Sequence, residues 1–258
     1  IEDISLIGGE PLLAKNFYDT LSRLEHVFGP VAKDKNYLGL TLVSNLNASE
    51  KVFSKFLKHA AKLSNLFSIK VSASTEACGG RAEYIRFGLS WKNFVRNTEA
   101  LLNSGIENLV FSFQTTINSL SISSLTSLIE FAIDLETKFN HSVHLKFNVV
   151  NSNPHLSPRI LTEDFKFYLD QAMGLLHKKN RVDLKKSKQN NWETFAKHLK
   201  NLRDQLPAQP SEPHLQAARK MFYNYIKDHD LKRKTTFEKT FPEYKDFLSL
   251  CKETLRAP

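Results

Sequence analysis

The segment Gly8-Gly9-Glu10-Pro11 follows the apolar run 4–7 directly and combines residue types that could bind a charged ligand. Glycines carry no side chain, so a ligand can come close to the backbone beside them. Pro11 fixes the turn and donates no backbone hydrogen bond, which leaves carbonyl groups exposed around it. Carbonyl oxygens and the Glu10 carboxylate together suit a ligand ammonium group. A four-residue pattern is also compatible with an ordinary strand-to-helix turn.

Polar residues of a suitable kind follow the next two apolar segments. Asn45 comes after segment 37–43, and Ser74 and Glu76 come after segment 67–72. Hydroxyl and carboxylate oxygens can accept hydrogen bonds from the hydroxyl groups of a ligand. Two of these residues also have structural explanations, because Asn45 could cap the following helix and Glu76 could be a solvated loop acid.

Two further residues could complete such a site. Arg86 lies in segment 83–88, which has the sequence E-Y-I-R-F-G. An arginine guanidinium can bind a carboxylate through two parallel hydrogen bonds, although Arg86 could instead pair with Glu83 on one helical turn. At the end of a fifth apolar segment, Val149 offers an apolar surface to a ligand.

Taken in chain order, these segments resemble the radical S-adenosylmethionine (SAM) superfamily. Segment 8–11 resembles the GGEP sequence at the end of that family's second strand, whose backbone binds the methionyl amine of SAM. Segments 43–47 and 72–76 resemble the ends of the third and fourth strands, and segment 83–88 resembles the one whose arginine lies near the SAM carboxylate. The resemblance implies a SAM site that contains Gly8, Gly9, Glu10, Pro11, Asn45, Ser74, Glu76, Arg86 and Val149.

Two features, segment 83–91 with the sequence E-Y-I-R-F-G-L-S-W and the C-terminal tail, narrow the resemblance to twitch-domain radical SAM proteins, which are often encoded by phages and marine microbes. The resemblance implies a peptide or protein substrate, with the helical tail helping to bind it. Segment 178–213 matches no pattern of that family. The matching tail residues are Met221-Phe222, Asp230, Lys232-Arg233, Thr236 and Phe241-Pro242-Glu243.

The family's cluster-binding sequence C-x-x-x-C-x-x-C does not occur in these residues. The two cysteines, Cys78 and Cys251, are too few to hold an iron–sulfur cluster or a structural zinc ion. Because residues 1–7 already resemble a buried strand, we expect the chain to be an N-terminally truncated part of a parent enzyme. The resemblance implies that the parent holds a [4Fe–4S] cluster and cleaves SAM to a 5′-deoxyadenosyl radical, whereas this chain alone is expected to be inactive.

Apolar and amphipathic segments alternate along the first 150 residues, which predicts βα units and a parallel sheet with its functional residues at the carboxyl ends of the strands. Together with the resemblance, the pattern predicts an α/β fold: a partial (β/α) TIM-like radical SAM barrel that lacks its first strand, with a C-terminal helical extension. Strands are expected at 4–9, 37–43, 67–72, 108–116 and 143–150, and helices at 16–28, 49–63, 91–103 and 124–138.

From about residue 161 the apolar spacing becomes helical throughout. We therefore expect two domains, a partial barrel at 1–160 and a helical extension at 161–258. Helical stretches are expected at 165–176, 192–202, 215–228 and 241–255, with a proline-rich linker at 206–213.

The chain carries a formal net charge of +9, concentrated in segments 178–188 and 232–234. A basic surface can attract nucleic acid, but charge runs are usually solvated helix faces, and no RNA-binding signature accompanies them. Neither an apolar run of 18 residues nor a signal peptide is visible, which predicts a cytoplasmic protein with no membrane partner.

Two functions therefore remain open. The chain is either the SAM-binding part of a radical SAM enzyme or a degenerate, non-catalytic module. Such a module would bind SAM, another nucleotide-like ligand or a nucleic acid without radical chemistry.

Overall fold

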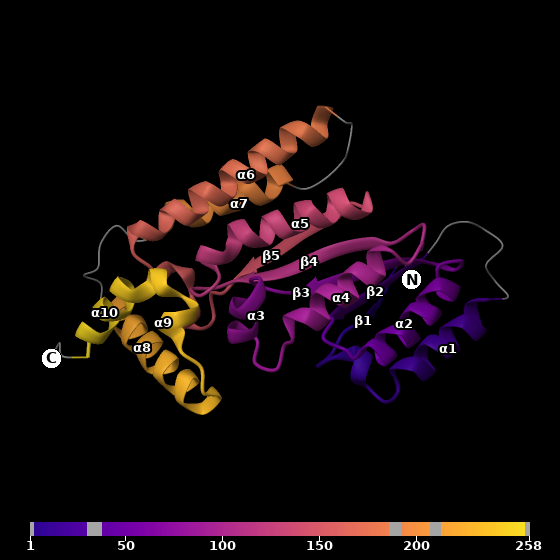
Figure 1. The fold of residues 1–258 in the computed structure, drawn as a ribbon, viewed down its shortest axis with the longest axis horizontal. Helices are drawn as coiled ribbons and strands as arrows, with labels where there is room; N and C mark the ends of the chain where they lie inside the picture. Colours follow the sequence, from indigo (N-terminus) through magenta and orange to yellow (C-terminus); the bar gives the residue numbers. More distant parts are fainter. Residues whose placement is uncertain (1–2, 30–37, 186–191, 207–212, 256–258) are drawn as a thin grey trace. The chain divides into compact units, whose positions relative to one another are not determined.

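The structure is a computed structural model that describes residues 3–29, 38–185, 192–206 and 213–255. Strands and helices alternate along its first 149 residues (Figure 1). The expected strands and helices of this part are confirmed in type and order, except for residues 1–2 and 37, which lie outside the described residues. The strands are β1 (Asp3–Leu6), β2 (Leu38–Ser44), β3 (Phe67–Ser74), β4 (Val110–Ile117) and β5 (Val143–Val149), and the helices are α1 (Phe17–Phe28), α2 (Glu50–Leu63), α3 (Gly79–Ile85), α4 (Trp91–Leu102) and α5 (Leu125–Phe139).

The five strands form one sheet in the order β1-β2-β3-β4-β5. β1 pairs in parallel with β2, β2 with β3, and β3 with β4. Leu42 lies beside Val71 in this register, and Val71 lies beside Phe111. Parallel neighbours need a crossover connection, which the intervening helices provide. The predicted α/β class with a parallel sheet is therefore confirmed.

The central strands and their covering helices follow from their apolar patterns. In β3, the side chains of Phe67 and Val71 are fully buried, and both lie on the same face because successive side chains of a strand alternate between its two faces. Helix α2 buries Phe53, Phe56 and Leu63, which recur at helical spacing and form one apolar face. These segments build the core that supports the ends of the strands.

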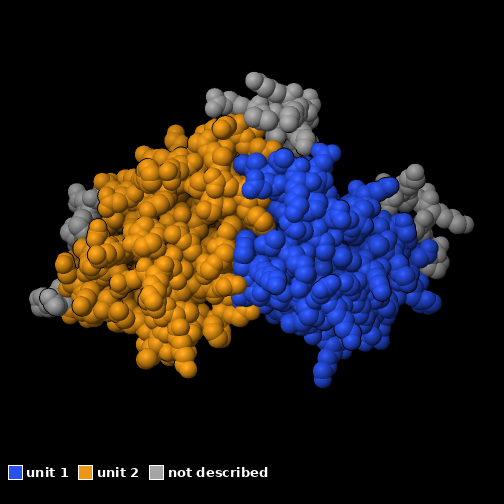
Figure 2. All heavy atoms as spheres, viewed as in Figure 1, with its two compact units in different colours: residues 1–75, 89–114, 132–146 blue, residues 76–88, 115–131, 147–258 orange. Residues whose placement is uncertain are grey.

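The chain divides into two compact units, and neither is continuous in sequence (Figure 2). Unit 1 comprises residues 1–75, 89–114 and 132–146, and unit 2 comprises residues 76–88, 115–131 and 147–258. Unit 1 thus contains β1 to β3 and the first parts of β4 and β5. The predicted domain boundary at residue 160 lies within unit 2.

Unit 2 contains helices α6 (Lys166–Lys185), α7 (Trp192–Asp204), α8 (Pro213–Arg233), α9 (Phe237–Thr240) and α10 (Lys245–Glu253). Helices α6 and α7 lie side by side, and Arg203 of α7 pairs with Asp170 of α6 (Figure 1). The four expected helical stretches are confirmed, while residues 207–212 of the expected linker and 186–188 of the basic segment lie outside the described residues. None of the helices in the described ranges combines the length and the apolar character that crossing a bilayer requires.

Candidate functional site

The glycine pair after β1 lies beside open space. Gly8 and Gly9 are both exposed, and Gly8 has a φ of +154°, a conformation that residues with side chains rarely adopt. Apart from each glycine and its chain neighbours, no atom of the described residues lies within 4 Å of the position that a Cβ atom would take there. Pro11 is buried and begins a short 3-10 turn, Pro11–Leu13. The backbone at residues 8–9 is therefore accessible to a ligand, while Pro11 anchors the segment in the core.

The Glu10 carboxylate joins the end of β1 to the end of β2. Its Oε1 atom accepts hydrogen bonds from the Ser44 hydroxyl at 2.6 Å and the Leu12 N–H at 3.3 Å. Its Oε2 atom accepts from the Asn45 N–H at 2.8 Å. A carboxylate has about four acceptor positions, so three are occupied within the protein. Glu10 thus fixes the loop geometry, and the nearby backbone carbonyls remain as the principal groups for a ligand cation.

Asn45 belongs to a loop that polar side chains hold in place. Its Oδ1 atom accepts from the Asn47 N–H at 2.9 Å, and Leu46 between them has a positive φ of 49°. The buried Asn97 amide of α4 donates to the carbonyl groups of Leu46 and Ala48, each at 2.8 Å. Asn45 does not cap α2, whose N-cap position is Ser49. Sequence reasoning missed Asn97, a polar residue that is buried on the inner face of α4 together with Phe94 and Leu101.

Ser74 is the final residue of β3 and is half buried. It lies beside Gln114 in the register of β3 with β4, and the next N–H along the chain, that of Thr75, donates to the Gln114 carbonyl at 3.2 Å. Among the described residues, the Ser74 hydroxyl makes no hydrogen bond that would occupy it. Ser74, Asn45 and the segment 8–11 therefore stand at the carboxyl ends of three adjacent parallel strands of unit 1.

Within unit 2, Glu76 and Arg86 bind each other. Arg86 donates from Nε to Glu76 Oε2 and from Nη2 to Glu76 Oε1, both at 2.5 Å. Glu76 is buried, whereas 32% of the Arg86 side chain is exposed. The sequence spacing suggested Glu83 as the partner of Arg86, and the structure identifies Glu76, ten residues upstream. The pair leaves Nη1 of the guanidinium and the outer lone pairs of the carboxylate for further contacts.

Val149 is the last residue of β5 and is half buried. The following N–H, that of Val150, donates to the Ile117 carbonyl at the end of β4 at 2.9 Å. Val149 belongs to unit 2, as do Glu76 and Arg86. The predicted residues thus fall into two sets, one in each unit.

Neither cysteine fits a cluster ligand. Cys78 directs its Sγ atom at the Ser127 carbonyl at 3.6 Å, and burial raises the pKa of its thiol to about 12. Cys251 is fully buried in α10, and burial raises its pKa to about 12 as well. Metals bind the thiolate, which such pKa values disfavour. Within the described residues, no three His, Cys, Asp or Glu side chains are grouped to hold a metal ion.

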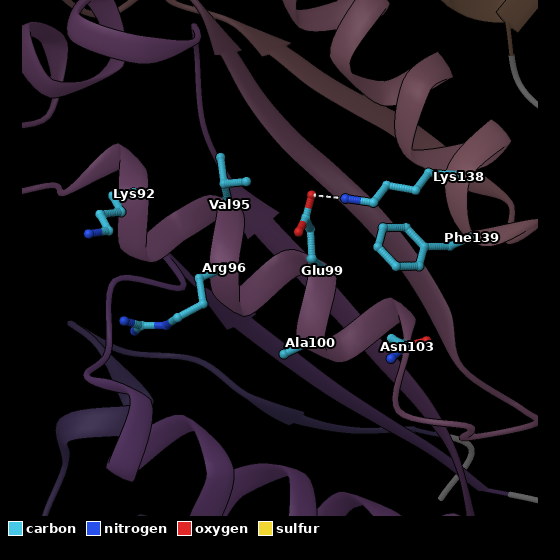
Figure 3. A pocket seen from close by; sticks show the side chains of 8 residues that line it. All are labelled: Lys92, Val95, Arg96, Glu99, Ala100, Asn103, Lys138 and Phe139. Carbon is cyan, nitrogen blue, oxygen red and sulfur yellow. Dashed lines mark hydrogen bonds and ion pairs between the residues drawn. The ribbon is translucent and has the colours of Figure 1, made fainter.

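A separate groove on unit 1 lies between α4 and the end of α5 (Figure 3). Lys138 crosses one side of it and pairs with Glu99 at 2.7 Å. Arg96 is occupied, because it donates to the Ala48 carbonyl at 3.0 Å and to Asn97 Oδ1 at 3.2 Å. Sequence reasoning did not predict this groove. Its lining residues are Lys92, Val95, Arg96, Glu99, Ala100, Asn103, Lys138 and Phe139.

Comparison of the chain with protein-family models, curated proteins and solved structures gives no match. The resemblance to radical SAM proteins therefore rests on the order of short motifs along the chain.

Proposed function

We propose that this chain binds SAM as the SAM-binding wall of a partial (β/α) barrel of the radical SAM type. One observation carries the proposal: segment 8–11, Asn45 and Ser74 stand at the carboxyl ends of three adjacent parallel strands. Ligands of open α/β sheets bind outside these ends. The order of the residues along the sheet is the order in which the resembling family uses them.

The resemblance, rather than the placement of the two units, assigns each polar part of SAM a candidate partner. The ammonium group would contact backbone carbonyls at Gly8 and Gly9, because Glu10 is already engaged by three donors. The carboxylate would bind Arg86, whose charge is partly balanced by Glu76. The ribose hydroxyls would bind Ser74 and the outer lone pairs of Glu76, and the adenine would pack on an apolar surface such as Val149.

The proposal for this chain covers binding and orientation. The radical chemistry of the resembling family depends on a [4Fe–4S] cluster, and the donor set of this chain does not fit one. The SAM-binding residues proposed above would orient SAM. A cluster would need ligands from other residues than these. The substrate class that we propose is a peptide or protein.

Binding of SAM to two arginine variants tests the proposal. Arg86→Ala should weaken SAM binding at least ~tenfold, because it removes a charge-assisted hydrogen bond to the carboxylate. Arg203→Ala is the matched control: Arg203 also pairs through two nitrogens with one carboxylate, that of Asp170, and 35% of its side chain is exposed. Titration calorimetry should show that Arg203→Ala binds like the wild type. Equal affinity of the two variants for SAM would contradict the proposed role of Arg86.

The alternative, a non-catalytic nucleic-acid module, is favoured by the net charge of +9. The salt dependence of binding distinguishes the two functions. Contacts to several phosphates make the logarithm of the binding constant fall with slope of about −0.7 to −0.9 per phosphate against the logarithm of salt concentration. SAM binding should change little between low and moderate salt, whereas tight binding of an oligonucleotide with a steep salt dependence would favour the alternative.

A further inference from the structure

Helix α3 needs support from its surroundings. It has seven residues and begins with Gly79 and Gly80. An isolated helix of this length is unstable in water, and glycine lowers its stability further. Arg86 is the C-cap residue of α3, and its N–H donates to the Ala82 carbonyl at 2.9 Å. The position of Arg86 therefore depends on whatever holds α3.

Tyr84 is the main contact of α3 with the C-terminal helices of unit 2. Its buried hydroxyl donates to Asp230 Oδ1 at 3.0 Å, and its ring stacks on His229 with the ring centres 4.1 Å apart. The Asp230 carboxylate also accepts from the Thr235 hydroxyl at 2.9 Å and from the Phe237 N–H at 2.8 Å. Because these two further donors fix the Asp230 carboxylate, it provides a rigid anchor for the Tyr84 side chain.

The two ends of the segment 81–87 have contacts of the same kind. Arg81 pairs with Glu243 at 2.9 Å, and its guanidinium lies over the Phe241 ring at 5.2 Å. At the other end, the guanidinium of Arg233 lies over the exposed Phe87 ring at 4.9 Å. Four tail residues of the sequence pattern thus contact the segment that carries Arg86, namely Asp230, Arg233, Phe241 and Glu243.

We propose that the C-terminal tail positions Arg86 for the carboxylate of SAM, with Tyr84, His229 and Asp230 as positioning residues. The inference rests on the proposed function and gives the tail pattern a role within it. None of the three residues needs to touch SAM. They act by fixing α3, so that the Arg86 guanidinium stays paired with Glu76 and presents its remaining nitrogen in one orientation.

Comparing the binding of two ligands distinguishes a role of Tyr84 in positioning Arg86 from a general loss of order in the site. SAM carries the amino-acid carboxylate, and 5′-methylthioadenosine lacks the amino-acid group. Tyr84→Phe removes the hydroxyl that anchors α3 and keeps the stacked ring. Calorimetry should show SAM binding weakened ~5-fold in Tyr84→Phe, as expected for one displaced charge-assisted contact, and 5′-methylthioadenosine binding unchanged. Equal weakening of both ligands, or no weakening of SAM binding, would overturn the positioning role.

The matched control is Tyr223→Phe on the same helix as Asp230. Tyr223 is half buried, and its ring lies under the ammonium group of Lys227 at 5.5 Å. Its hydroxyl makes no hydrogen bond among the described residues, so the substitution keeps the known contact. Both ligands should bind Tyr223→Phe as they bind the wild-type chain.

Hydrogen exchange on the ligand-free chain tests the same inference without SAM. Tyr84→Phe should raise amide exchange in residues 81–88 about tenfold, because α3 loses an anchor, and leave helix α4 unchanged. Unchanged amide exchange in residues 81–88 would overturn the inference, whatever the SAM affinity of the variant. A wild-type chain that binds no SAM would contradict the proposed function, and the exchange result would still decide separately whether the tail holds α3.

Discussion

Three carboxylates of this protein act first as structural acceptors. Glu10 accepts from three donors, Glu76 from two nitrogens of Arg86, and Asp230 from three donors. The sequence predicted that Glu10 and Glu76 belong to one type of site, but it could not predict these partners, because each bond except that of Leu12 to Glu10 joins residues five or more positions apart in the chain. Residue types at strand ends are visible in a sequence, whereas their pairings depend on the folded chain.

Glu10→Gln should destabilise the protein by about 1–3 kcal/mol, because a side-chain amide cannot accept all the hydrogen bonds that the carboxylate accepts. Urea unfolding measures this change. Glu107→Gln is the control, since Glu107 is exposed and makes no hydrogen bond or ion pair among the described residues. The control should stay within about 0.5 kcal/mol of the wild type. A Glu10→Gln variant of wild-type stability would contradict the structural role of Glu10.

His229 should make stability dependent on pH. Burial, followed by the nearby charge of Arg233, lowers its pKa, while the Tyr84 carbonyl and Asp230 act in the opposite direction. The Nε2 atom lies 3.0 Å from the Tyr84 carbonyl and 2.6 Å from Arg233 Nη1, and it can accept from Arg233 only when it carries no proton. The folded protein therefore favours the neutral ring.

With the folded pKa below the unfolded value of about 6.5, the unfolded chain binds more protons in this range, and stability falls as pH drops through about 6.5. Three other histidines have lowered pKa values, so a single variant removes only part of the effect. His229→Gln should reduce the slope of unfolding free energy against pH between about pH 5 and 7. An unchanged slope would show that His229 does not contribute. The other three histidines are His59, His144 and His155.

At the scale of elements, apolar runs and helical spacing predicted the five strands and the long helices, most of which bury an apolar face. The exception is β1, because none of its residues Asp3–Leu6 is buried, although the sequence of residues 1–7 resembles a buried strand. Helix α3 was missed. It begins with two glycines and has seven residues, so neither length nor composition indicates a helix. Contacts that are distant in sequence, such as that between Tyr84 and Asp230, stabilise it instead.

The two glycines of α3 should respond oppositely to alanine. Gly80 has room for a Cβ atom and lies within the helix, so Gly80→Ala should stabilise the protein by about 0.5–1 kcal/mol. Gly79 has a φ of +60°, where alanine is strained by about 1–2 kcal/mol, so Gly79→Ala should destabilise it. Thermal unfolding of the two variants shows whether each substitution raises or lowers the stability of the protein. The same sign for both would contradict the described start of α3.

At the scale of the molecule, the sequence predicted the α/β class, the parallel sheet and the helical tail. It placed a domain boundary at residue 160, whereas the compact units interleave along the chain. Short segments such as 76–88 join unit 2 although they follow β3 directly, and contacts of this kind leave no periodic signal. The predicted site residues consequently belong to both units. Those between Gly8 and Ser74 belong to unit 1, whereas Glu76, Arg86 and Val149 belong to unit 2.

Equilibrium dialysis of the wild-type chain against radiolabelled SAM measures whether this chain binds SAM. We expect saturable binding of about one SAM per chain, with competition by S-adenosylhomocysteine and little change when salt is raised. The same result is expected without iron or sulfide, because binding is assigned to residues of this chain. Absence of saturable SAM binding by a folded chain would contradict the proposed function.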